Sequence, residues 1–153
     1  MPEEPSLTVE ISSDPTRLDI DFIHEFLRTS YWAPEIPREI VERSVRHSLC
    51  FGAYRLDTGH QVGFARVVTD RATFGYVADV FVTPEHRGCG VSKRMMAAIL
   101  AHPELQGLRR LMLATKDAHG LYAQFGFKPL ASPADFLTIH HTDMYRGNGP
   151  AGG

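Results

Sequence analysis

The sequence predicts one α+β domain, with a mixed and mostly antiparallel sheet and helices on both of its faces. Its 153 residues, of which 43% are hydrophobic, suit a single domain with a real core. Along the chain, apolar residues switch several times between strand-like alternation and helical spacing. Residues 73–115 combine strand, glycine turn, helix and strand, which predicts a right-handed parallel crossover inside an otherwise antiparallel sheet.

The N-terminal part predicts one strand and two helices. Residues 7–12, "LTVEIS", alternate as a half-buried strand does. Apolar residues then recur at helical spacing and predict a helix over residues 16–30. A second helical pattern follows Pro37, a residue type that fits a first helical turn.

The middle of the chain predicts three consecutive antiparallel strands and a helix. Residues 50–56 and 61–69 flank the turn sequence "DTGH" and predict a hairpin. Residues 73–82 predict the third strand. The helix that follows begins near Val91 and ends at His102, which precedes a proline.

The C-terminal part predicts a strand over residues 108–115 and a short helix within residues 118–127, closed by a glycine. Two last strands are predicted within residues 127–130 and 136–145.

Composition disfavours several classes of protein. The net charge of −2 argues against a duplex-DNA binder, whose affinity comes largely from neutralised phosphates. Cys50 and Cys89 are too few for a disulfide scaffold and are expected to be reduced. The start "MPEEPS" lacks the features of a secretory signal, and no apolar run approaches the roughly 20 residues of a membrane span. We expect residues 1–146 to form one cytoplasmic domain without nucleic-acid or membrane partners, followed by a flexible tail at 147–153.

The stretch "VFVTPEHRGCGVSKRMM" predicts an anion site where a helix begins. The first amides of a helix have no partners inside the helix, and Gly88 and Gly90 leave them uncovered. Arg87, Lys93 and Arg94 add positive charge, so the expected anion is a phosphate or pyrophosphate. The spacing fits neither a Walker loop nor the dinucleotide fingerprint. A plain strand-to-helix turn is the alternative.

This stretch resembles the acetyl-CoA signature of GNAT-type N-acetyltransferases, Arg/Gln-x-x-Gly-x-Gly/Ala after a strand. Arg87, Gly90 and Ser92 occupy its three positions, and Ser92 is small enough to replace the usual Gly or Ala. About 30 residues later, "HGLYAQFGF" resembles the family's Ala-x-x-Leu-Tyr-x-x-x-Gly-Phe helix. The order of elements also matches the family fold. The resemblance implies a sheet that splays between its fourth and fifth strands, and acetyl transfer from acetyl-CoA to an amine.

The resemblance also implies which residues bind acetyl-CoA. The pyrophosphate would lie beside Arg87, on the backbone of Gly88, Cys89, Gly90, Val91, Ser92 and Lys93. The pantetheine arm and the thioester carbonyl would bind free backbone groups of Val80, Phe81 and Val82. The eight histidines show no metal-ligand spacing, so no metal is expected.

Two proton transfers need an acid and a base. Tyr122 matches the family tyrosine that serves as the acid, although a tyrosine capping the core would give the same pattern. Asp79, a carboxylate in an apolar run, is the predicted base. Strict alternation places it on the opposite face from Val80 and Val82, unless a β-bulge re-aims it. A purely structural carboxylate at Asp79, with His119 as the base, is the alternative.

The acceptor in this family depends on the segment between the first two helices. Here Tyr31 and Trp32 suggest an aromatic wall that binds substrate, or else a latch over the core. Asp70 could attract a cationic amine. We expect direct attack, in a ternary complex, by a small-molecule or peptide amine. A non-catalytic acyl-CoA-binding regulatory module is the alternative. Family members are often monomers or homodimers.

Overall fold

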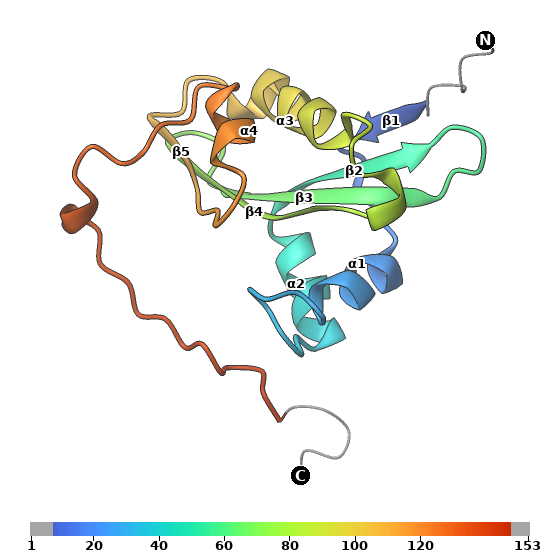
Figure 1. Cartoon of the computed structure of the whole chain (residues 1–153), viewed down its shortest axis with the longest axis horizontal. Helices are drawn as coiled ribbons and strands as arrows, with labels where there is room; N and C mark the ends of the chain where they lie inside the picture. The colour runs from blue at the N-terminus through green and yellow to red at the C-terminus, as the bar shows by residue number, and fades with distance from the viewer. Residues whose placement is uncertain (1–7, 148–153) are drawn as a thin grey trace.

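The computed structural model describes residues 8–147, which form a five-stranded sheet in the order β1-β2-β3-β4-β5 (Figure 1). The strands are β1 Val9–Ser12, β2 Leu49–Arg55, β3 Gln61–Thr69, β4 Phe74–Val82 and β5 Arg110–Leu113. The α-helices within these residues are α1 Ile20–Leu27, α2 Arg38–Arg46, α3 Val91–Ala101 and α4 His119–Ala123. Neighbouring strands are antiparallel from β1 to β4, and β4 pairs with β5 in parallel. The predicted mixed sheet with one parallel crossover is confirmed.

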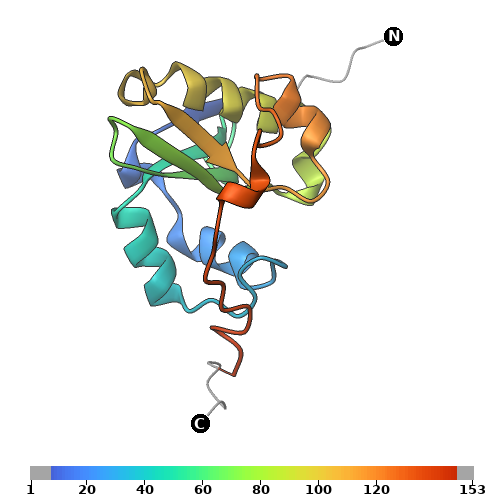
Figure 2. The same ribbon diagram turned by 90° about the vertical axis from the view of Figure 1, so that its left-hand side faces the viewer.

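Helices cover both faces of the sheet (Figures 1 and 2). One apolar cluster joins α1 and α2 to Cys50, Phe64 and Phe81 on one face of the sheet. A larger cluster on the opposite face joins the sheet to α3 and includes Tyr122 of α4. The side chain of Cys50 is buried, which raises the pKa of its thiol to about 12. None of the helices within residues 8–147 is long and apolar enough to cross a bilayer.

The first helix is shorter than the predicted span of residues 16–30. The Asp19 carboxylate accepts a hydrogen bond from the Phe22 amide at 3.1 Å and caps the start of α1. Before it, Pro15–Arg17 form a separate 3₁₀ turn, capped in the same way by Asp14. Two capping carboxylates therefore divide a segment that apolar spacing alone predicts to be one continuous helix.

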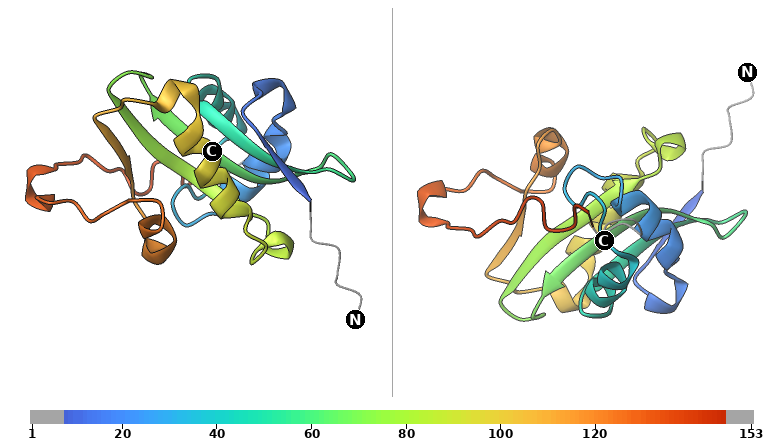
Figure 3. Two further views of the ribbon diagram at one scale, coloured as in Figure 1. Left: turned by 90° about the horizontal axis from the view of Figure 1, so that it is seen from above. Right: turned by 90° about the horizontal axis from the view of Figure 1, so that it is seen from below.

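The sheet opens between β4 and β5, seen from both sides in Figure 3. Their pairing runs from Phe74 opposite Arg110 to Val77 opposite Leu113. Beyond Val77, β4 continues to Val82 without a partner in β5. This divergence is the predicted splay, and it leaves the end of β4 without a strand partner on that side.

The prediction of strands within residues 127–130 and 136–145 is wrong for this structure. These residues carry no strand, and a 3₁₀ turn at Pro133–Asp135 lies between them. After Phe136 the chain runs away from the sheet, with Leu137 96% and Ile139 90% exposed (Figures 1 and 2). Alternation identifies a segment that can form a strand, but it does not determine whether that segment pairs with a sheet edge. The predicted tail at 147–153 lies outside the described residues, except for Gly147.

The buried hydroxyl of Tyr54 is expected to lower the free energy of unfolding. Its hydroxyl is buried and finds no hydrogen-bond partner among the described residues. An unsatisfied buried hydroxyl costs about 1–3 kcal/mol, so Tyr54→Phe should raise the free energy of unfolding by about 1 kcal/mol. Urea denaturation measures this change, and a clearly lower free energy of unfolding would show that the hydroxyl does find a partner.

Candidate active site

Two left-handed glycines shape the turn between β4 and α3. A short 3₁₀ turn, Pro84–His86, leads into it. Gly88 and Gly90 have φ angles of 78° and 79°, which L side chains rarely adopt. A β-carbon at either glycine would meet no atom within 4 Å, so the space beside the turn is open. Gly90 directly precedes α3, and the unpartnered amides at the start of that helix face an unobstructed region.

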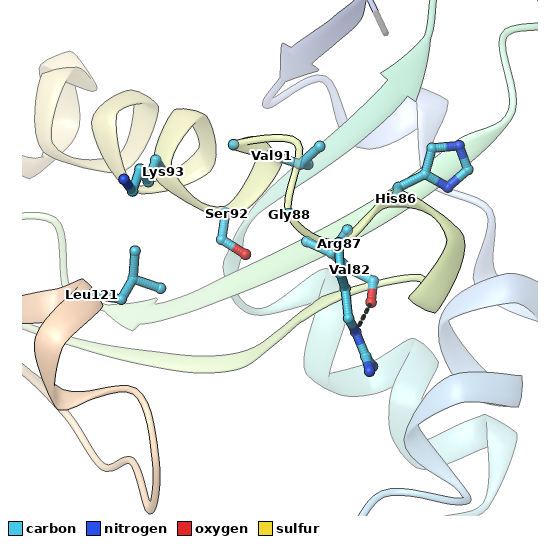
Figure 4. Close-up of a pocket in the computed structure, with 9 residues that line it drawn as sticks. Val82, His86, Arg87, Gly88, Val91, Ser92, Lys93 and Leu121 are labelled. Carbon is cyan, nitrogen blue, oxygen red and sulfur yellow. Dashed lines mark hydrogen bonds between the residues drawn. The ribbon is translucent and has the colours of Figure 1, made fainter.

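A pocket of about 280 Å³ lies at this turn (Figure 4). It is lined by Val82, His86, Arg87, Gly88, Gly90, Val91, Ser92, Lys93 and Leu121. Most of the residues predicted to bind acetyl-CoA therefore surround one cavity. Val80, Phe81 and Cys89 do not line it, and Cys89 is a free, exposed thiol.

Sequence reasoning missed two residues of the lining, His86 and Leu121. His86 lies in the 3₁₀ turn, where its Nδ1 is 2.7 Å from the Thr83 hydroxyl. Leu121 approaches from α4, across from the first turn of α3 (Figure 4). The sequence carries a signal for both residues. His86 directly precedes Arg87, and Leu121 belongs to the second family signature.

The end of β4 presents a backbone carbonyl beside the pocket. The Thr83 amide donates to the Val62 carbonyl at 2.9 Å, so Thr83 forms a hydrogen-bonded pair with β3. Because such pairs alternate along antiparallel strands, the backbone of Val82 points away from β3, toward the splay. Arg87 Nε donates to the Val82 carbonyl at 3.1 Å and brings its guanidinium to this place (Figure 4).

Two charged residues singled out in the sequence lie elsewhere. Arg94 donates to the Val9 carbonyl of β1 and so belongs to the sheet contact rather than to the pocket. Asp70 lies before β4, at the opposite end of the strand from Val82. Its carboxylate accepts hydrogen bonds from the Thr73 hydroxyl and nearby backbone amides, which lower its pKa. Asp70 therefore stabilises the β3–β4 turn.

A β-bulge sets the direction of Asp79. Asp79 and Val80 together lie opposite Ala65 of β3, and Asp79 has a φ of 56°. Val77, Val80 and Val82 all pack in the α3-side cluster, although the first two are an odd number of positions, three, apart. The bulge thus shifts the alternation, and Asp79 lies on the α1–α2 face, opposite Val80 and Val82.

Both oxygens of the Asp79 carboxylate are engaged there. Arg66 Nε donates to Oδ2 at 2.8 Å, and the indole of Trp32 donates to Oδ1 at 2.9 Å. The ion pair is mostly buried, with 11% of the Asp79 side chain and 18% of the Arg66 side chain exposed. Arg66 also donates to the Ser48 hydroxyl at 3.2 Å. Asp79 therefore connects β3, β4 and the segment between α1 and α2.

Tyr31 and Trp32 form an aromatic row with the sheet. Their rings meet edge-on at 5.0 Å, and Trp32 lies 6.4 Å from Phe26. Phe26 stacks on Phe81 of β4 at 3.8 Å. The ammonium of Lys116, after β5, lies 4.4 Å from the centre of the Tyr31 ring. The segment between α1 and α2 thus contacts the β5–α4 connection across the open edge of the sheet.

Tyr122 lies on α4, next to Leu121 of the pocket lining. Its ring is buried and meets Phe127 edge-on at 5.9 Å. Burial raises the pKa of the Tyr122 hydroxyl, and the nearby Tyr31 and Asp117 raise it further. The phenol stays protonated at neutral pH and can donate a proton. Residues 8–147 contain no group of three or more His, Cys, Asp or Glu side chains placed to hold a metal ion.

The sequence and the structure also match known proteins. The family model described as acetyltransferase (GNAT) family matches residues 15–127. A Gibberella zeae protein, named as a candidate acetyltransferase, is 34% identical over 135 residues, which cover 74% of this chain and 75% of that protein.

Solved structures show the same fold. The crystal structure of a candidate GNAT acetyltransferase from Xanthomonas campestris pv. campestris is 51% identical, with a TM-score of 0.87, over 91% of this chain and 97% of that one. N-acetylglutamate synthase from Neisseria gonorrhoeae, solved with coenzyme A and N-acetyl-glutamate, is 22% identical with a TM-score of 0.63. That match covers 96% of this chain and 34% of the synthase. With its family model spanning both signatures and the splayed sheet, this chain belongs to the acetyltransferase (GNAT) family.

Proposed function

We propose that this protein is an N-acetyltransferase that uses acetyl-CoA to acetylate a primary amine of a small molecule or peptide. The main support is the open glycine turn at the start of α3, where unpartnered amides, Arg87 and Lys93 surround a pocket. These groups fit a pyrophosphate, and acetyl-CoA bound there would supply the acetyl group. The related synthase that was solved with coenzyme A supports the same cosubstrate.

The residues around the splay are proposed to orient the reactants. The backbone of residues 88–93 binds the pyrophosphate, and the backbone of Val80 and Val82 binds the pantetheine arm. Phe81 is not one of these groups, because it pairs with Phe64 and its backbone faces β3. Tyr31 and Trp32 hold the acceptor beside the end of β4. Positioning the amine against the thioester lowers the barrier by several kcal/mol, on the order of 7–11 kcal/mol at best. The amine attacks directly, without an acetylated enzyme.

Tyr122 is the proposed general acid. Because burial raises its pKa, its hydroxyl retains the proton that the departing thiolate of coenzyme A requires.

Asp79 has two candidate roles, as the base and as the group that orients Trp32. Asp79→Asn removes the charge but keeps the shape, and we expect kcat/KM for the acceptor to fall about 10- to 100-fold. A lower kcat that recovers at higher pH would identify Asp79 as the base. At that pH the amine is already deprotonated and needs no base. A higher KM for the acceptor, together with a red-shifted fluorescence emission of Trp32, would show that Asp79 orients Trp32. Trp32 is the single tryptophan, so the emission reports on it alone.

A matched control for this variant is Asp57→Asn. Asp57 also pairs with an arginine, Arg55, but in the exposed β2–β3 turn. It should leave kcat/KM and the emission unchanged. An Asp79→Asn protein with wild-type values of both would exclude both roles.

Release of coenzyme A thiol tests the proposed function. Purified protein with acetyl-CoA is assayed against polyamines, amino acids, aminoglycosides and peptides with free N-termini. We expect saturable release that depends on one class of amine, with intersecting double-reciprocal plots and no acetylated enzyme in mass spectra. Coenzyme A binding without turnover on any amine would contradict an enzymatic role and favour a regulatory acyl-CoA-binding module.

A further inference from the structure

Two oppositely charged neighbours, Lys116 and Asp117, lie on the β5 side of the splay. They follow β5, which ends at Leu113, and they precede α4, which carries Tyr122. Both residues are exposed, and within residues 8–147 neither side chain forms a salt bridge. Two unpaired charges beside the proposed site of reaction are therefore free to bind charged groups of a ligand.

The Lys116 ammonium lies against the aromatic row that is proposed to hold the acceptor. It is 4.4 Å from the centre of the Tyr31 ring, and Tyr31 in turn meets Trp32 edge-on at 5.0 Å. Figure 1 shows the β5–α4 connection and the segment between α1 and α2 approaching each other on one side of the sheet. An ammonium has three N–H donors, and contact with the face of a ring leaves donors for an oxygen acceptor. Lys116 can therefore bind an anionic group of a ligand that packs against Tyr31.

The same residues lie close to the proposed general acid. Tyr31 and Asp117 both raise the pKa of the Tyr122 hydroxyl, an effect that requires each of them to be near it. Asp117 thus adds a negative charge near the group that gives its proton to the departing thiolate. An acceptor ammonium must arrive in this neighbourhood, and Asp117 would attract it there.

An acceptor with a second cationic group fits this region less well. The Asp79 carboxylate already pairs with the Arg66 guanidinium and accepts the indole hydrogen bond of Trp32, so its charge is compensated within the protein. On the other side of the splay, a second ammonium would meet Lys116, and two like charges placed side by side repel each other. A carboxylate in the same place would instead be attracted.

We infer that the acceptor is a small zwitterion of the amino-acid type, whose carboxylate binds Lys116 and whose amine lies near Asp117 and Tyr122. The inference rests on the proposed acetyl transfer and names the class of its acceptor. An amino acid carries its two charges a short distance apart, and two consecutive residues supply the complementary charges. The hydrogen bond between ammonium and carboxylate is charge-assisted, and it would hold the amine in one orientation toward the thioester.

Matched acceptors test this class. Thiol release from acetyl-CoA is measured with free amino acids, their carboxamides, the corresponding dipeptides and diamines. For the preferred amino acid, kcat/KM should exceed that of its carboxamide by about 10- to 100-fold, as expected for one charge-assisted hydrogen bond. Dipeptides, whose carboxylate lies further from the amine, should also be poorer acceptors. A wild-type enzyme that uses the carboxamide, the dipeptide or a diamine as well as the free acid overturns the inference.

Lys116→Met tests the residue itself, since methionine keeps an unbranched apolar side chain but removes the charge. The ratio of kcat/KM between the amino acid and its carboxamide should fall to about one. Lys128→Met, a matched change of an exposed lysine beyond α4, should keep the wild-type ratio. A Lys116→Met enzyme with the wild-type ratio, or a Lys128→Met enzyme that loses it equally, overturns the role of Lys116.

A binding measurement separates this inference from the proposed function. Non-aromatic amino acids are titrated into protein saturated with coenzyme A, and the fluorescence of Trp32, the single tryptophan, reports occupancy beside Tyr31. A saturable change that Lys116→Met weakens by about 10- to 100-fold, and Lys128→Met does not, supports the site even in a protein that transfers no acetyl group. Turnover of amines without a preference for a carboxylate would keep the acetyltransferase but overturn the acceptor class. A protein that gives neither turnover nor a fluorescence change with any amino acid overturns it as well.

Discussion

Gly90→Ala should weaken coenzyme A binding by about 10- to 100-fold. The substitution places a methyl group in the open space where the pyrophosphate is proposed to approach the first amides of α3. Losing one hydrogen bond to a charged group costs about 1.5–3 kcal/mol, which corresponds to that range of affinity. Isothermal titration calorimetry with coenzyme A measures the effect.

Gly59→Ala is the matched control for backbone strain. Gly59 has a φ of 76° in the β2–β3 turn, and a β-carbon there also meets no atom within 4 Å. Both variants should lose similar stability, since a left-handed residue costs about 1–2 kcal/mol. Only Gly90→Ala should lose affinity. Equal affinities in the two variants would place the pyrophosphate somewhere other than this turn.

Local chemistry explains which parts of the fold could be predicted. The hairpin of β2 and β3 and the turn before α3 depend on contiguous residues, such as Gly88 and Gly90, whose conformations neighbours cannot easily change. The helix predicted over residues 16–30 was too long because two capping aspartates divide it. Residues 136–145 show the limit of periodicity, which identifies a segment that can form a strand but not whether it pairs with a sheet edge.

The site likewise has a part that the sequence predicts and a part that it does not. Arg87, Gly90 and Ser92 lie close together in the sequence, so one motif predicts most of the pocket lining. The contact between Trp32 and Asp79 joins residues 47 positions apart and depends on a β-bulge. Strand alternation predicted the face of Asp79 relative to Val80, but no sequence pattern indicates which group its carboxylate meets there. Tertiary packing decides that contact.

Tyr122→Phe should lower kcat by about 100- to 1,000-fold, within the usual contribution of a general acid. Phenylalanine keeps the ring that packs against Phe127, so folding and coenzyme A binding should be unchanged. What is lost is the proton for the departing thiolate. Single-turnover measurements with saturating amine and acetyl-CoA isolate this step from binding and product release.

The pH dependence of kcat distinguishes an acid from a packing residue. Tyr122 must be protonated to act, and burial raises its pKa above the usual value of about 10. The wild-type rate should therefore persist through pH 10 and fall only above it, and this fall should be absent from Tyr122→Phe. Tyr54→Phe is the matched control, because burial also raises the pKa of Tyr54, to about 12, away from the pocket. If Tyr122→Phe kept both the wild-type kcat and the alkaline fall, Tyr122 would be a core residue and the thiolate would take its proton from another donor.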